Sequence, residues 1–254
     1  MAVVTNQILK IIADELRKIP GGEAPELVNS FHKDIVAQLE RFIASGEKIR
    51  FVIAGFPIKS MSRVKTISDS ADRAEELSLK FLNSVCQKIQ ALYPAGAEVN
   101  IYSDMFSYLE YFPSTFTKAK IDAYVKGVHK LIRDNDLTHI NYTKLDMTLA
   151  ELKEFAESEA EFSARMKDNS PENIGDIMLY RGLNKFCLPE IEASYTLRPA
   201  SEQVSNSAKK REAKRMATGI AIMSVAHRKA LIAAEPDAIR LSAHAKPSAV
   251  PQLG

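Results

Sequence analysis

The stretch that most constrains the fold is residues 48–65, KIRFVIAGFPIKSMSRVK, in which an apolar run is followed by a cationic loop. Apart from Arg50, residues 49–53 are β-branched or aromatic. A short apolar run bounded by turn residues is typical of a buried strand in a parallel sheet. We expect this strand to end at Gly55-Phe56-Pro57, because proline lacks the N–H group that a ladder needs.

The loop after this strand is rich in positive charge and hydroxyl groups, which are carried by Lys59, Ser60, Ser62, Arg63 and Lys65. In open α/β sheets, ligands bind beyond the carboxyl ends of the strands. Lysine and arginine supply charge and serine supplies short hydrogen bonds, so a phosphate or a carboxylate is the natural ligand of such a loop. A solvated basic loop without a ligand is the alternative, and this stretch alone leaves both readings open.

The composition excludes some classes of function. The 254 residues include 34 basic and 32 acidic side chains, and this balance gives no case for nucleic acid or a membrane as the main partner. The N-terminal residues lack the features of a signal peptide and no run approaches the length of a membrane span, so a cytoplasmic protein is expected. Cys86 and Cys187 lie in apolar segments and are expected to be core thiols rather than a disulfide.

The pattern of the whole chain predicts one domain over residues 1–254, with an N-terminal helix over 1–20, a core over 25–246 and a tail over 247–254. Strands are predicted near 49–55, 98–103, 137–142 and 239–243. Helices are predicted near 5–18, 25–45, 70–93, 114–133, 148–167, 172–188 and 202–234, with a loop between Pro189 and Pro199. This alternation indicates an α/β fold, a Rossmann-like and mostly parallel sheet flanked by helices.

Standard catalytic signatures do not occur in the sequence, which has no GxGxxG, Walker A, CxxC, HExxH or GxSxG pattern. The five histidines show no pair at metal-ligand spacing, and no metal is expected. The groups available for chemistry are polar residues near strand ends: Lys59, Ser60, Ser103, Asp104, Arg240, Ser242 and His244. Each also has an ordinary structural role open to it, such as a turn cap for Asp104.

Several segments, taken in order, resemble one protein family. They are FVIAGFPIKS at 51–60, AEELSLKFLNSVCQKIQALYPAGAEVNIYSD at 74–104, LYRGLNKF at 179–186, AKKREAKRM at 208–216 and IRLSAHAK at 239–246. The chain resembles the pyoverdine/dityrosine biosynthesis proteins, the isocyanide (isonitrile) synthases, from about residue 5 to residue 246.

This resemblance implies a Rossmann-related enzyme that converts the α-amino group of tyrosine or tryptophan to an isocyanide. The carbon donor would be C2 of ribulose 5-phosphate, with no metal or redox cofactor. An iron/2-oxoglutarate oxygenase would be a possible downstream partner in the pathway. The resemblance places Lys59, Asp104 and His244 on motif positions of the family, and the proton transfers of this reaction make them the expected catalytic residues. The residues expected to bind substrate or phosphate are Ser60, Lys65, Ser103, Arg181, Arg211, Arg240 and Ser242.

Two further expectations concern the geometry of these residues. Lys59, Arg181 and Arg240 are expected on one rim, because crowded cations repel one another unless an anion compensates them. If the last strand lies beside the strand that ends at Ser103, Asp104 and His244 can form a carboxylate–histidine pair that moves protons.

The chain departs from the family pattern at two places. Met105 follows Ser103-Asp104 where the family has glycine, and the family's Pro-Trp-His stretch has no counterpart, since the sequence contains no tryptophan. These departures leave open a non-catalytic pentose-phosphate or amino-acid-binding protein of the same fold. Another Rossmann-like enzyme of sugar phosphates or amino acids is a third reading.

Overall fold

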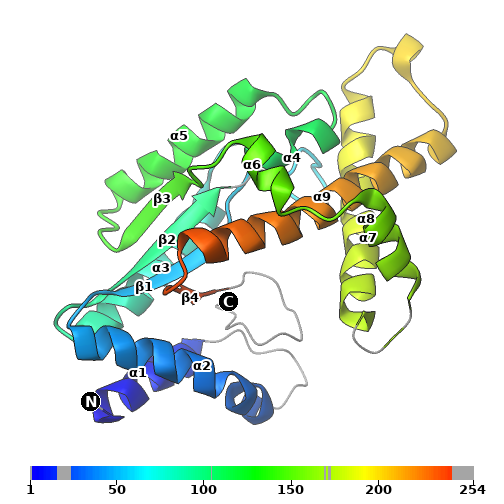
Figure 1. The fold of residues 1–254 in the computed structure, drawn as a ribbon. Helices are drawn as coiled ribbons and strands as arrows, with labels where there is room; N and C mark the ends of the chain where they lie inside the picture. Colours follow the sequence, from blue (N-terminus) through cyan, green and yellow to red (C-terminus); the bar gives the residue numbers. More distant parts are fainter. Residues whose placement is uncertain (1, 16–23, 104, 169, 171–172, 242–254) are drawn as a thin grey trace.

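The computed structural model describes residues 2–15, 24–103, 105–168, 170 and 173–241 (Figure 1). Their centre is a four-stranded sheet in the order β3-β2-β1-β4, and every neighbouring pair is parallel. The strands are β1 (Ile49–Ala54), β2 (Ala97–Ser103), β3 (Ile140–Lys144) and β4 (Ile239–Arg240). The predicted α/β class with a parallel sheet is therefore confirmed.

Helices occupy most of the remaining described chain. They are α1 (Ala2–Glu15), α2 (Ala24–Ser45), α3 (Arg73–Gln90), α4 (Met105–Tyr108), α5 (Lys118–Asp134), α6 (Leu149–Glu154), α7 (Glu159–Lys167), α8 (Ile174–Thr196) and α9 (Asn206–Ala234). Two short 3-10 turns, η1 (Leu109–Tyr111) and η2 (Ala200–Glu202), complete the described elements.

The main hydrophobic core lies on one face of the sheet. Alternate strand residues such as Phe51 and Ile101 point to this face, as the two-residue period of a strand requires. Helices α1, α2, α3 and α5 cover them with buried residues that include Ile8, Leu39 and Val128. The apolar run of β1 is therefore buried as predicted.

The opposite face is covered mainly by α6 and the second half of α9, where Met223 and Leu231 pack near Val52 of β1. The first half of α9 instead packs on α8, through residues such as Met216 and Ile191. Figure 1 shows α8 and this half of α9 extending past the end of the sheet. Helix α9 thus joins the sheet to a helical extension that contributes residues beside the strand ends.

The predicted elements differ from the structure at several boundaries, and three of these differences concern how the chain is divided into elements. The predicted loop between Pro189 and Pro199 is mostly helix, since α8 continues to Thr196. Pro189 cannot donate a helical hydrogen bond, but the burial of Cys187 and Ile191 against α9 stabilises the helix around it. The helix predicted over 148–167 is two helices, since the side chain of Ser158 caps a new one with a capping box. Strand β3 begins at Ile140, three residues late.

The last strand lies beside β1 and not beside the strand that ends at Ser103. The backbone N–H of Leu241 donates to the carbonyl of Val52 over 2.8 Å, and Arg240 is in register with Val52. The strand predicted over 239–243 is described only to Leu241. The geometric condition for pairing Asp104 with His244 on adjacent strands is therefore not met.

Two further expectations concern the cysteines and membranes. Cys86 and Cys187 are free and buried, as predicted, and burial raises the pKa of each thiol to about 12. Of the helices that the described ranges contain, none combines the length and apolar character needed to cross a bilayer.

Candidate active site

Lys59 follows β1 and is almost fully buried against the start of α3. Its ammonium group forms salt bridges with Glu75 at 2.8 Å and Asp72 at 3.1 Å. Burial by itself would lower the pKa of Lys59, but the hydrogen bonds and negative charges of Glu75 and Asp72 outweigh it and raise the pKa. Lys59 is thus a fixed ammonium ion rather than an uncharged nucleophile.

The carboxylates that hold Lys59 are themselves fixed by the helix start. Asp72 is the N-cap of α3: its side chain accepts from the backbone N–H of Ala74, and Glu75 accepts from the backbone N–H of Asp72. The hydroxyl of Tyr124 on α5 also donates to Glu75. The Lys59 cluster therefore joins the loop, α3 and α5.

A second cluster holds the loop against α8 through Glu190, which is 1% exposed. This carboxylate accepts hydrogen bonds from the hydroxyl of Ser60 and from the backbone N–H of Met61 at 3.0 Å. It also forms a 2.9 Å salt bridge with Lys65. Ser60 and Lys65, both expected to bind a ligand, are thus brought together, but by a carboxylate of the protein.

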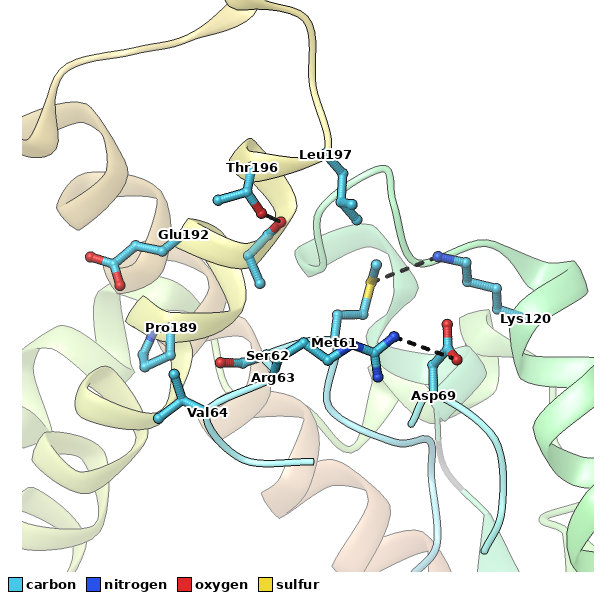
Figure 2. A pocket seen from close by; sticks show the side chains of 11 residues that line it. Met61, Ser62, Arg63, Val64, Asp69, Lys120, Pro189, Glu192, Thr196 and Leu197 are labelled. Atoms are coloured by element: carbon cyan, nitrogen blue, oxygen red, sulfur yellow. Dashed lines mark hydrogen bonds and ion pairs between the residues drawn. The ribbon is translucent and has the colours of Figure 1, made fainter. Parts of the chain in front are cut away.

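A cleft of about 650 Å³ opens beside this loop, between α8 and the start of α5 (Figure 2). Its lining is largely apolar near Met61, Val64 and Leu197. The cations on its wall already have contacts: Arg63 lies 3.8 Å from Asp69, and Lys120 approaches the sulfur of Met61.

A second cavity, of about 410 Å³, lies at the carboxyl ends of β2 and β3 between α5 and α9. We call it the carboxyl-edge pocket. Its polar lining includes Ser103 at the end of β2, Lys144 at the end of β3 and His227 on α9. Its remaining lining is Phe106, Ser107, Lys118, Asp122, Val125, Leu145, Met147 and Leu152.

The polar groups of this pocket differ from those of the loop in their pairing. The hydroxyl oxygen of Ser103 is buried and has no hydrogen-bond partner among the described residues. Lys144 is exposed and forms no salt bridge with any described carboxylate. Lys118, in contrast, is 3.1 Å from Asp122 on the same helix. The pocket therefore keeps a hydroxyl and a cation available for a ligand.

The other predicted site residues are dispersed or lie outside the description. Arg181 on α8 and Arg211 on α9 are exposed, and neither lines the pocket or the cleft. Arg240 is on β4, where burial and then the charge of Arg228 lower its pKa. No ion pair or described cavity joins Arg181 or Arg240 to Lys59 among the described residues. Asp104, Ser242 and His244 lie outside the described residues.

Two pocket residues were missed from the sequence, and one of them leaves a signal. His227 is the polar member of the buried stripe of α9 that contains Met223, Ala230 and Leu231. Lys144 was missed because the third strand was predicted to end at Tyr142. Over the ranges that the structure covers, there is no cluster of His, Cys, Asp or Glu that could hold a metal ion.

Comparison with known proteins matches the chain to one family over most of its length. The family model described as pyoverdine/dityrosine biosynthesis protein matches residues 39–168 and 150–254. An L-tyrosine isonitrile synthase of Xenorhabdus nematophila is 30% identical over 261 residues, which cover 95% of this chain and 73% of the relative. Its counterpart from Pseudomonas aeruginosa is 31% identical over 249 residues, or 93% and 69% of the two chains.

More distant relatives include an L-tryptophan isonitrile synthase of Fischerella ambigua, which is 25% identical over 201 residues, 75% of this chain and 59% of the relative. Among solved structures, the PvcA protein of Pseudomonas aeruginosa superimposes with a TM-score of 0.83 at 29% identity. That superposition covers 99% of this chain and 82% of PvcA.

Proposed function

The chain belongs to the pyoverdine/dityrosine biosynthesis protein family, and on that premise we propose that it is an isonitrile synthase acting on an aromatic amino acid. The observation that carries the proposal is the identity of 30 to 31% with two L-tyrosine isonitrile synthases over more than nine-tenths of this chain. We propose ribulose 5-phosphate as the carbon donor.

The proposed reaction needs an amine to condense with a ketone, followed by cleavage of carbon–carbon bonds. Both stages require proton transfers near neutral pH, for which an imidazole is well suited. His227 lines the carboxyl-edge pocket, and we assign it a proton-transfer role together with the family-matched Asp104 and His244.

Lys59 has a different role in this proposal. Its salt bridges with Glu75 and Asp72 favour the charged form, so a Schiff base on Lys59 would first require loss of that proton. We propose that its ammonium group orders the loop after β1 by holding it against the start of α3.

The phosphate of the donor requires cations that the protein does not neutralise. Arg240 is a candidate, because burial and then the charge of Arg228 lower its pKa, and no described carboxylate forms a salt bridge with either residue. An anion placed between two guanidinium groups would offset their repulsion and form charge-assisted hydrogen bonds.

The test is product formation from L-tyrosine or L-tryptophan with ribulose 5-phosphate labelled with ¹³C at C2. We expect an isonitrile product that carries the label, detected by mass spectrometry. Ribose 5-phosphate, which has no ketone at C2, serves as the matched control donor and is expected to yield none. Binding of both substrates without any product would contradict the proposal and favour the non-catalytic alternative.

A further inference from the structure

The ends of β2 and β3 place a hydroxyl and a cation side by side. Ser103 and Lys144 are paired in register, so their side chains leave the sheet on the same face from strands about 4.8 Å apart. The buried hydroxyl of Ser103 has no partner in the described chain, which is costly unless a ligand supplies one. Both residues line the carboxyl-edge pocket.

The charge of the pocket limits the kind of anion that it can hold. Lys118 and Asp122 neutralise each other at 3.1 Å, which leaves Lys144 as the uncompensated lysine among the described lining residues. One ammonium group balances a carboxylate. A phosphate ester carries close to two negative charges at neutral pH and is better matched by more than one cation.

The apolar part of the pocket also favours one substrate over the other. Phe106, Val125 and Met147 line it beside the polar groups. Transfer of an aromatic ring from water to such a surface is favourable. The hydroxyl groups of a pentose would instead lose hydrogen bonds to water there without regaining them.

We propose that the carboxyl-edge pocket is the amino-acid subsite. In this subsite, the ammonium group of Lys144 binds the α-carboxylate, the hydroxyl of Ser103 donates a hydrogen bond to it, and the apolar wall receives the aromatic side chain. The inference rests on the proposed function, which supplies the amino acid as the substrate class.

The test compares two ligands that differ only in the carboxylate. Calorimetry would measure the dissociation constants of L-tyrosine and tyramine with the wild type and with Lys144→Gln. We expect Lys144→Gln to raise the dissociation constant of L-tyrosine about tenfold, as for loss of one charge-assisted hydrogen bond. The dissociation constant of tyramine should stay nearly unchanged. Lys126→Gln is the matched control, because Lys126 is exposed on α5 outside the pocket lining and should change neither constant.

Three results would overturn the inference: equal changes for the two ligands, no change for either, or no binding of L-tyrosine to the wild type even with ribulose 5-phosphate present. A fourth is a weaker affinity of Lys144→Gln for ribulose 5-phosphate alone, which would place the phosphate in the pocket.

The binding result can be separated from the proposed reaction by an independent assay. Selective loss of L-tyrosine affinity with no isonitrile formed by the wild type would refute the proposed function and support the subsite. Isonitrile formation with an unchanged KM for L-tyrosine in Lys144→Gln would refute the subsite alone.

Discussion

The loop after β1 and the carboxyl-edge pocket lie at the same end of the sheet, yet they use their polar groups in opposite ways. In the loop, Lys59 and Lys65 are bound by carboxylates from α3 and α8. In the pocket, Ser103 and Lys144 have no such partners among the described residues. The charges of the loop therefore hold it to α3 and α8, whereas the polar groups of the pocket remain able to bind a ligand.

A cationic loop beyond a strand is therefore not by itself evidence of an anion site. What distinguishes the two regions is whether the fold supplies the counter-charge. Glu190 reaches Lys65 from 125 positions further along the chain, and no local pattern reveals that contact.

The largest effect is expected from removing the charge of Glu190. Glu190→Gln leaves Lys65 without its buried counter-charge and should lower the free energy of unfolding by about 3 kcal/mol. Chemical denaturation of the folded protein measures the loss. Glu192→Gln is the matched control, since Glu192 is exposed on the same helix and should change stability by less than about 0.5 kcal/mol. Equal losses in the two variants would contradict the structural role of the loop.

An effect of opposite sign is expected at Ser103. Ser103→Ala removes a buried hydroxyl that lacks a partner, and should raise the free energy of unfolding of the ligand-free protein by about 1 kcal/mol. The same variant should bind L-tyrosine more weakly. Ser107→Ala, at a second serine of the pocket lining, is the control. A loss of stability in Ser103→Ala would mean that its hydroxyl is already satisfied, and would remove the contrast between the two regions.

The smallest effect concerns the pH dependence of the Lys59 cluster. The hydrogen bond from the backbone of Ala74, with those of Lys59 and Ser68, lowers the pKa of Asp72 below its ordinary value of 3.8. A lowered pKa contributes stability that is present above the ordinary value and is lost as pH falls through the lowered one. Asp72→Asn keeps an N-cap but not the charge, so its stability should fall less steeply than that of the wild type as pH is lowered from about 5 to about 2. Identical pH profiles from denaturation at each pH would show that Asp72 contributes no ionic stabilisation.

Much of the fold could be predicted from the sequence, because its signals are local. The apolar run of β1 and the apolar stripe of α3, with its helical spacing, can both be read within short segments of the sequence. Both elements lie where they were expected. The start of β3 was missed because turn residues continue to His139, whereas the apolar pattern already begins at Leu137. The position of β4 beside β1 depends on long-range packing, for which no local pattern exists.

The candidate site was less predictable for the same reason. Lys59, Ser60 and Ser103 were found because they follow strands directly. Their partners, or lack of partners, depend on side chains that only the fold brings near. His227 and Lys144 became visible as site residues once α9 and β3 were placed around one cavity.

The most direct measurement is a crystal structure of the protein with L-tyrosine bound. We expect the α-carboxylate within hydrogen-bonding distance of the ammonium group of Lys144 and the hydroxyl of Ser103, with the ring against Phe106 and Met147. An amino acid bound instead in the cleft lined by Met61, Lys120 and Leu197 would contradict it.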